Sequence, residues 1–157
     1  MPPKHWQESA TETVQVVLPN DSNPLGFMLG GSVMHLIDIT GAIACHRHTN
    51  TLALTAAVDG LEFVHPIRMG DIIILKARVT ATFRTSLEVE VEVFSEEILT
   101  GRRQPTSRAF LTFVSIDAEG KPLPVPPLRL DTSDDEARSL AAHARRATRL
   151  AHRATRG

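Results

Sequence analysis

One uninterrupted apolar segment constrains the fold of this chain more than any other feature. Residues 32–48, SVMHLIDITGAIACHRH, contain no proline and are apolar on nearly every side, apart from His35 and Asp38. A surface helix carries one apolar stripe, whereas a helix that is apolar all round is buried. The segment therefore predicts a long buried helix, and the Gly30-Gly31 pair before it permits close backbone approach.

Alternating segments surround this helix and predict β-strands at 13–18, 52–64, 72–83, 87–93 and 108–117. Between Leu75 and Phe83 apolar residues occupy every second position, and polar residues lie between them. The next segment alternates Glu88, Glu90 and Glu92 with leucine and valine. This is the pattern of a sheet with one buried face. We expect an α+β layer arrangement in which one strand, the helix and a four-stranded meander follow in order, leaving a charged face for water or a partner.

The C-terminal segment has a different composition. Ser133 and Glu136 have the spacing of a capping box, and residues 137–157 contain six arginines and no acidic residue. We expect a basic helix after a proline-rich linker, with a mostly alanine side that buries little. The chain then divides into a loose N-terminus at 1–12, one domain at 13–130 and an Arg-rich helix at 131–157. A solvated helix packed on its own oligomer is a simpler reading than a nucleic-acid or lipid contact.

The composition argues against several classes of protein. Across 157 residues, 17 basic and 18 acidic side chains leave a net charge of −1, so neither a nucleic-acid nor a membrane partner is expected. No segment is apolar enough to span a bilayer, and the N-terminus lacks an apolar signal core, so we expect the cytoplasm. The single Cys45 excludes an intrachain disulfide, and the seven histidines lack ligand spacing. We therefore expect neither a metal nor a cofactor.

Asp38 is the strongest candidate for chemistry. An ionised carboxylate in an apolar helix is costly unless it is paired or hydrated, so such a residue has either a task or a partner. The plain alternative is a structural carboxylate that bonds a neighbouring turn or Arg47. The backbone N–H groups of Gly30 and Gly31 suit an oxyanion at a helix N-terminus, although a tight turn explains two glycines equally well.

These groups are too far apart to act on one bond from a single helix. Asp38 lies two turns beyond Gly31, or about 10 Å along the axis. Two antiparallel helices from two subunits would bring the Asp38 of one close to the glycines of the other. A catalytic interpretation therefore predicts a two-fold dimer with shared active sites.

Two loops offer further polar groups. Asn23 precedes the glycines and could orient water or a substrate carbonyl, although an asparagine beside proline usually makes a turn. The segment Arg84-Thr85-Ser86 joins two strands and presents a cation and two hydroxyls where a phosphate could dock, or an ordinary hairpin turn.

In order and spacing, these segments resemble a known family. Residues 23–31, NPLGFMLGG, followed by Asp38 and Arg47-His48, resemble the opening of hotdog-fold acyl-CoA thioesterases, above all the cytosolic acyl-CoA hydrolases and the bacterial YciA-like enzymes. The segment TAAVD, residues 55–59, and the later Thr85-Ser86 also match. The similarity covers roughly residues 14–128 and leaves the arginine-rich tail outside.

The resemblance implies a long helix wrapped by a five- to six-stranded antiparallel sheet, with dimers that commonly form trimers of dimers. It implies hydrolysis of acyl-CoA to a free acid and CoA without a cofactor, CoA being part of the substrate. Asp38 would be the general base or nucleophile, with Asn23 from the other subunit and Gly31, beside Gly30, at the oxyanion. Residues near the CoA would be Arg84, Thr85, Ser86 and Thr55.

Two other functions fit the same fold. A non-catalytic hotdog domain could bind acyl-CoA as a sensor or scaffold, but it would not need both Asn23 and Asp38. A hotdog hydratase typically has an aspartate and a histidine five residues apart, and here Ile43 lies at that offset from Asp38. Hydrolysis is therefore the favoured function.

Overall fold

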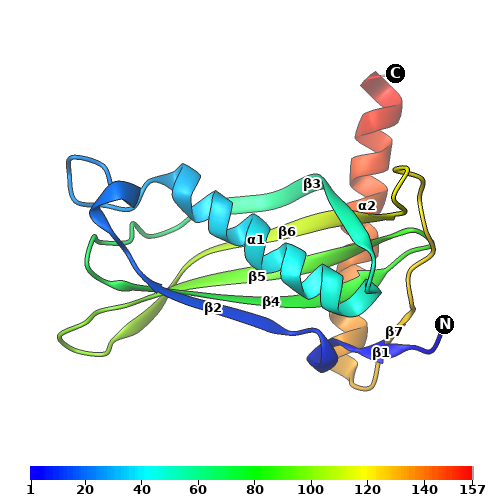
Figure 1. Cartoon of the computed structure of the whole chain (residues 1–157), viewed down its shortest axis with the longest axis horizontal. Helices are drawn as coiled ribbons and strands as arrows, with labels where there is room; N and C mark the ends of the chain where they lie inside the picture. Colours follow the sequence, from blue (N-terminus) through cyan, green and yellow to red (C-terminus); the bar gives the residue numbers. More distant parts are fainter. Residues whose placement is uncertain (157) are drawn as a thin grey trace.

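The computed structural model describes residues 1–156 and contains one five-stranded sheet with a helix on each face (Figure 1). The α+β class, the antiparallel sheet, the long helix and the C-terminal helix are all as predicted. The elements of these three layers are α1 Gly30–Thr49, α2 Ser133–Arg156, β2 Thr11–Val16, β3 Leu52–Phe63, β4 Ile72–Thr82, β5 Ser86–Glu96 and β6 Arg103–Ile116. Neither helix, within the described residues, is long and apolar enough to cross a membrane.

The strand order corrects the predicted four-stranded meander. The sheet runs β2-β4-β5-β6-β3, so only β4, β5 and β6 form a meander. The strand after the helix, β3, pairs with β6 at one edge, and β2 occupies the other edge. Periodicity shows which side of a strand is buried but carries no information on its neighbours, so the sequence pattern could not reveal this crossover.

Helix α1 lies along the inner face of the sheet and covers the core. Its buried residues include Val33, Ile37 and Ala44, which pack on Leu75, Val91, Leu111 and Phe113 of the strands. Gly41 allows this contact to be close, because a Cβ there would lie 3.4 Å from the Phe113 ring. The helix ends at Thr49, and the capping residue Asn50 adopts the left-handed conformation with φ 55°.

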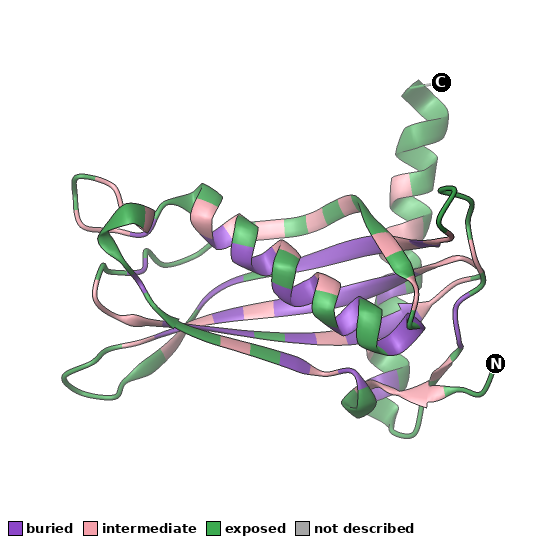
Figure 2. Cartoon of the chain, in the orientation of Figure 1, coloured by how far each residue is buried: buried purple, intermediate pink, exposed green. Residues whose placement is uncertain are grey.

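The prediction that α1 is buried on all sides is wrong for the isolated chain. The side of the helix that faces away from the sheet is solvent-exposed, and Figure 2 shows this stripe along its length. Ile39 and Ile43 lie on that stripe with 41% and 37% of their surface exposed. An apolar exposed stripe of this kind indicates a further contact.

A β-bulge in β4 reverses the predicted orientation of its last residues. The pairing with β5 shifts between Val79 and Ala81, which leaves Thr80 as the extra residue. Because one inserted residue exchanges the two faces of a strand, Phe83 points to the outer face rather than to the core. Its ring contacts His143 of α2, with centroids 4.9 Å apart. Strand β6 likewise begins before the predicted residue 108, because a register shift accommodates Pro105.

The outer face of the sheet binds α2 mainly through charges. Glu88 and Glu90 are both buried, and they pair with Arg145 and Arg138 of the helix at 2.8 Å. The predicted charged face therefore meets a partner from the same chain. Burial raises the pKa of Glu90, whereas the guanidinium of Arg138 acts against that shift.

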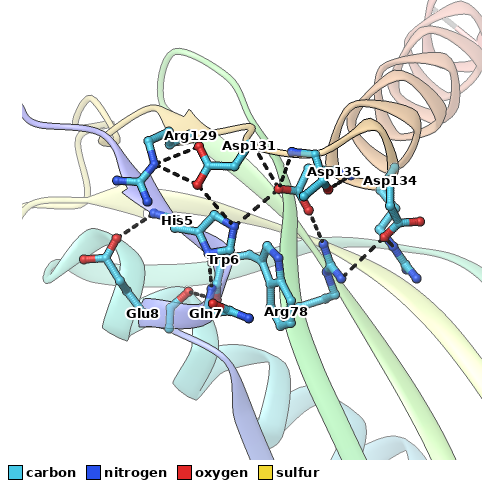
Figure 3. A network of polar contacts seen from close by, with 12 residues as sticks. His5, Trp6, Gln7, Glu8, Arg78, Arg129, Asp131, Asp134 and Asp135 are labelled. Carbon is cyan, nitrogen blue, oxygen red and sulfur yellow. Dashed lines mark hydrogen bonds and ion pairs between the residues drawn. The ribbon is translucent and has the colours of Figure 1, made fainter.

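A polar network holds the start of α2 against the N-terminal residues (Figure 3). Residues 1–12, which the composition suggests are loose, instead form β1 Lys4–His5, a 3-10 turn Trp6–Glu8 and the start of β2, and β1 pairs with β7 Leu128–Arg129. His5 Nε2 lies 3.3 Å from Asp135, which also accepts a hydrogen bond from Arg78. The Arg78 guanidinium stacks on Trp6 at 3.8 Å.

The helix cap differs from the predicted Ser133–Glu136 box. Thr132 Oγ1 accepts a hydrogen bond from the backbone N–H of Asp135, and the Asp135 carboxylate accepts one from the N–H of Thr132. The capping box is therefore Thr132–Asp135, one residue earlier. Burial works against ionisation of Asp135, but hydrogen bonds from Asp131, Thr132 and His5 outweigh it and lower its pKa.

Candidate active site

Asp38 lies at the surface between α1 and the edge strand β3. It is half-buried, and Thr55 Oγ1 donates a hydrogen bond of 2.7 Å to its Oδ1. Of the two structural alternatives, the pair with Arg47 is wrong, because Arg47 donates instead to Ala10 O and Thr11 Oγ1 at 3.1 Å. The carboxylate of Asp38 is thus oriented by one hydroxyl and lies where solvent or a second molecule can reach it.

Asn23 lies in the loop that precedes α1. Its Oδ1 accepts hydrogen bonds from the backbone N–H groups of Leu25 and Phe27, at 3.0 and 3.1 Å. These bonds make the turn that an asparagine beside proline commonly makes. Asn23 also lines a cavity of about 340 Å³ together with Gly30 and Phe63.

Gly30 and Gly31 form the first turn of α1. Within residues 1–156 their N–H groups donate no backbone hydrogen bond, as is usual at the start of a helix. A Cβ on Gly30 would lie 3.6 Å from the Phe63 ring, whereas a Cβ on Gly31 would meet nothing within 4 Å. The glycines therefore offer N–H donors at an open helix N-terminus, where negative charge is favoured.

One chain does not bring all the predicted residues together. Asp38 bonds Thr55, and Asn23 lines the same cavity as Gly30, but two turns of α1 separate the two groups. A carbonyl group is much smaller than this separation. The geometry of a single chain can therefore supply either a carboxylate or an oxyanion site, and both only if a second copy contributes one of them.

The segment Arg84-Thr85-Ser86 forms the connection between β4 and β5. Thr85 O accepts a hydrogen bond from Ser115 N at 2.9 Å, and Ser86 pairs with Val114 of β6. Thr55 pairs with the adjacent Phe113 from the other side of β6. The connection and Thr55 therefore lie at the same end of β6, with that strand between them, and Arg84 is exposed.

Other chemistries find little support in the described residues. Residues 1–156 contain no group of three or more histidine, cysteine or acidic side chains placed to hold a metal. Cys45 is buried in α1, and burial raises the pKa of its thiol to about 12. Since the thiolate is the reactive form, Cys45 is a poor nucleophile.

Two further residues line the Asn23 cavity and are not among those that the sequence predicts for the site. His65 and Ser107 line it, from the turn after β3 and from β6 respectively. His65 stands before a proline and reads as a turn residue, and Ser107 has no motif around it. No sequence signal distinguishes either residue, because only the crossover beneath the start of α1 brings them together.

Comparison with known proteins finds similar sequences and structures. Residues 25–101 match the family model of the thioesterase superfamily. The chain is 36% identical to the uncharacterized acyl-CoA thioester hydrolase YkhA of Bacillus subtilis, over 82% of this chain and 75% of that protein. It is 38% identical to the cytosolic acyl coenzyme A thioester hydrolase of Rattus norvegicus, over 83% of this chain, but spans only 35% of that longer protein.

Solved structures agree with these sequence relationships. The crystal structure of an apo-hexameric acyl-CoA thioesterase superposes with a TM-score of 0.93 at 37% identity, covering 98% of this chain and 99% of the other. An acyl-CoA hydrolase from Staphylococcus aureus, solved with butyryl coenzyme A and coenzyme A, superposes with a TM-score of 0.90 at 31% identity, covering 98% and 94%.

Three variants of the Staphylococcus aureus hydrolase have also been solved. In each, one residue is replaced by alanine: an asparagine, an aspartate or a threonine. Along that chain the asparagine comes first, the aspartate second and the threonine third. Their separations along the chain equal those between Asn23, Asp38 and Thr55 here.

Proposed function

The chain belongs to the thioesterase superfamily, and from this premise we propose that it hydrolyses acyl-CoA thioesters to a free carboxylic acid and CoA. The resemblance to hotdog-fold acyl-CoA thioesterases seen in the sequence is confirmed. The observation that carries the proposed site is the 2.7 Å hydrogen bond between Thr55 and Asp38 at the exposed edge of the sheet. The matching separations in the Staphylococcus aureus variants support the same residues.

In this proposal Asp38 acts on the thioester carbonyl as general base or nucleophile. As a base, it takes a proton from water while the water oxygen bonds the carbonyl carbon. As a nucleophile, its own oxygen bonds that carbon, and water then hydrolyses the acyl-enzyme. In both cases the negative charge on the carbonyl oxygen develops near the N–H of Gly31, and the carbon–sulfur bond breaks to release CoA. Thr55 fixes the orientation of the carboxylate.

The proposed site is completed by a second copy of the chain. Strand β3 is a long edge strand with unpaired backbone groups, and Leu54 on it is 59% exposed. An exposed apolar edge of this length is a template for pairing with another chain. Pairing two β3 strands antiparallel extends the sheet, covers the exposed stripe of α1 and brings Asp38 of one subunit towards Asn23 and Gly31 of the other.

A larger assembly and the CoA contacts complete the proposal. We propose three such dimers in a hexamer, supported by the hexameric neighbour. Arg84, Thr85 and Ser86 would contact the CoA part of the substrate, since they lie at the same end of β6 as Thr55. No resident metal or cofactor is required, because a thioester carbonyl is electrophilic enough for a positioned carboxylate and water.

The first test is CoA release from a panel of acyl-CoAs, C2 to C16, by the wild type and Asp38→Asn. The substitution is nearly isosteric, so the fold should survive while the base is lost. We expect turnover to fall by about 100-fold or more. Equal turnover would remove Asp38 from the mechanism, and absent turnover in both proteins with CoA still bound would favour an acyl-CoA sensor. Rapid quench of a single turnover, followed by peptide mass spectrometry, then distinguishes the two roles, because only a nucleophilic Asp38 carries the acyl group.

Subunit mixing tests the shared site. Asp38→Asn and Asn23→Ala are each expected to be inactive alone. In a mixed dimer one of the two sites contains both substitutions and the other contains neither, so a refolded equimolar mixture should regain about a quarter of the wild-type activity. No recovery in a mixture shown to contain mixed dimers would place both residues in one chain's site.

A further inference from the structure

Three arginines on the side of α2 that faces the sheet each pair with an acidic residue on a strand beneath the helix. Arg138 pairs with Glu90 at 2.8 Å, and Arg145 pairs with Glu88 at 2.8 Å. The two glutamates lie on β5. The last of these contacts is Arg149, whose Nη1 lies 2.7 Å from Asp59 on β3. Since β3 is the edge of the sheet, the row of acids in this chain ends there.

The helix continues past that edge. Figure 1 shows the C-terminal turns of α2 extending beyond β3, and Figure 2 shows them exposed. His152, Arg153 and Arg156 continue the sheet-facing stripe and line, with Asp59 and Gly60, an open cavity of about 660 Å³. Among residues 1–156, none of these three side chains has an acidic partner. We call residues 150–156 the overhang.

We infer that the overhang binds the outer face of the sheet of a second copy of this chain. The inference rests on the proposed function in one respect, the dimer formed through β3. In that dimer the partner's β3 lies about 4.8 Å beyond this one, where the sheet of the single chain stops. The overhang is about 10 Å long, enough to cross the first one or two strands of the partner.

The charges of the two surfaces are complementary. The outer side of β3 carries Asp59 and Glu62, and Glu62 is exposed and has no ion pair within the described residues. Two overhangs, by contrast, carry only cations and repel each other. Arg153 and Arg156 of one subunit therefore meet the partner's acidic β3, and the two-fold axis repeats the contact. The basic helix becomes a clamp across the dimer.

The first experiment reverses the charge of the clamp. Arg153→Glu/Arg156→Glu is compared with Arg102→Glu/Lys121→Glu, which changes the charge equally in two exposed turns. The dimer dissociation constant is measured by sedimentation velocity over a dilution series. We expect the overhang variant to weaken the dimer about tenfold or more and the control to leave it unchanged. An unchanged constant for the overhang variant would overturn the inference.

A second experiment identifies what the overhang touches. Arg153→Lys/Arg156→Lys keeps both charges and supplies amines, and the chain otherwise contains only three lysines. A zero-length carbodiimide joins an amine to a carboxylate in contact with it, and mixing isotope-labelled with unlabelled subunits shows which links cross between chains. Links from residues 153 and 156 to Asp59 or Glu62 of the other subunit support the clamp. Links confined to one chain contradict it.

The outcomes also separate this inference from the proposed function. Suppose that the wild type dimerises and hydrolyses acyl-CoA, and that the overhang variant has the same dimer dissociation constant. This result contradicts the clamp and leaves the proposed function standing. If that variant instead loses a thermal shift caused by inorganic phosphate, the overhang is an anion site and the clamp is overturned. A wild type that neither dimerises nor hydrolyses acyl-CoA contradicts the proposed function, on which the clamp depends.

Discussion

The two faces of the sheet are covered in opposite ways by two helices of similar length. Helix α1 packs on the inner face with apolar side chains such as Ile37, against Leu111 and Phe113. Helix α2 has an alanine-rich side and meets the outer face through arginines, which neutralise carboxylates as deeply buried as Glu88, 2% exposed. The same alternating strands thus support an apolar interface on one side and an ionic one on the other.

This difference predicts which face of the sheet contributes most of the stability. Apolar contacts are additive in buried area and depend little on angle, so the inner face forms the core. A buried ion pair must first offset the desolvation of both charges, so it adds less net stability than an apolar contact of similar size. We expect α1 to determine whether the domain folds and α2 to determine how its outer surface is presented.

The largest effect should follow from a cavity on the inner face. Phe113→Ala removes a ring that is 1% exposed, and we expect the free energy of unfolding to fall by about 3–5 kcal/mol. Urea denaturation measures the change. Leu140→Ala on α2 is the matched control, because Leu140 is 74% exposed and should change the free energy by less than about 0.5 kcal/mol. Similar losses in both variants would contradict the comparison.

Breaking one ion pair should rank second. Arg145→Ala leaves the buried Glu88 carboxylate without its cation, and we expect a loss of about 3 kcal/mol in the free energy of unfolding. Glu88→Leu/Arg145→Leu should recover most of that loss, since neither charge is then buried. The exposed pair between Arg103 and Glu96 is the control, and Arg103→Ala should cost less than about 1 kcal/mol. A double variant as unstable as Arg145→Ala would show that the outer face needs its charges.

Acidification should weaken the structure through a buried histidine of α1. His48 is fully buried, its Nε2 donates to Pro126 O at 2.7 Å, and burial lowers its pKa from the ordinary 6.5. Below pH 6.5 the unfolded chain therefore binds a proton that the folded chain does not, and stability falls as pH decreases, by at most about 1.4 kcal/mol per pH unit. Above pH 6.5 this residue contributes no slope.

His48→Gln tests this, because the amide keeps a donor for Pro126 without titrating. Unfolding free energies are compared at several pH values between 8 and 5. The outer face acts in the opposite sense, since the raised pKa of Glu90 makes the folded state bind protons more tightly just above 4.5. An equal pH slope in wild type and His48→Gln would show that another group is responsible.

The smallest effect should come from the cap of α2. Thr132→Ala removes the oxygen that accepts from Asp135 N at 3.0 Å, and we expect a loss of about 1 kcal/mol. Ser133→Ala, at the residue that the sequence pattern favoured as the cap, should change stability by a few tenths of a kcal/mol at most. Thermal unfolding followed by circular dichroism distinguishes the two. A larger loss of stability in Ser133→Ala than in Thr132→Ala would indicate that Ser133 is the capping residue after all.

The accuracy of the sequence predictions varied with the range of the interaction involved. The prediction that Glu88 and Glu90 lie on the other face of the strand from the valines beside them is confirmed, because alternation is a property of one strand. Phe83 was assigned to the wrong face, because the bulge at Thr80 depends on how β4 pairs with β5. Asp38 stood out as a carboxylate in an apolar helix, and its contact with Thr55 required the return of β3 along α1. The acids beneath α2 were visible as a charged face, but not as the partners of its arginines.

The sequence by itself determined the class of the fold, the two helices, the strands with their buried faces and the family, since all of these follow from local periodicity and from the order of short motifs. The tertiary structure alone decided the strand order, the pairing of Asp38 with Thr55, the ion pairs between α2 and the outer face, and the overhang beyond β3. Contacts between residues distant in the chain depend on how whole elements pack. No local pattern encodes that packing, so the open edge of the sheet becomes apparent only once β3 is seen to pair with β6 on one side alone.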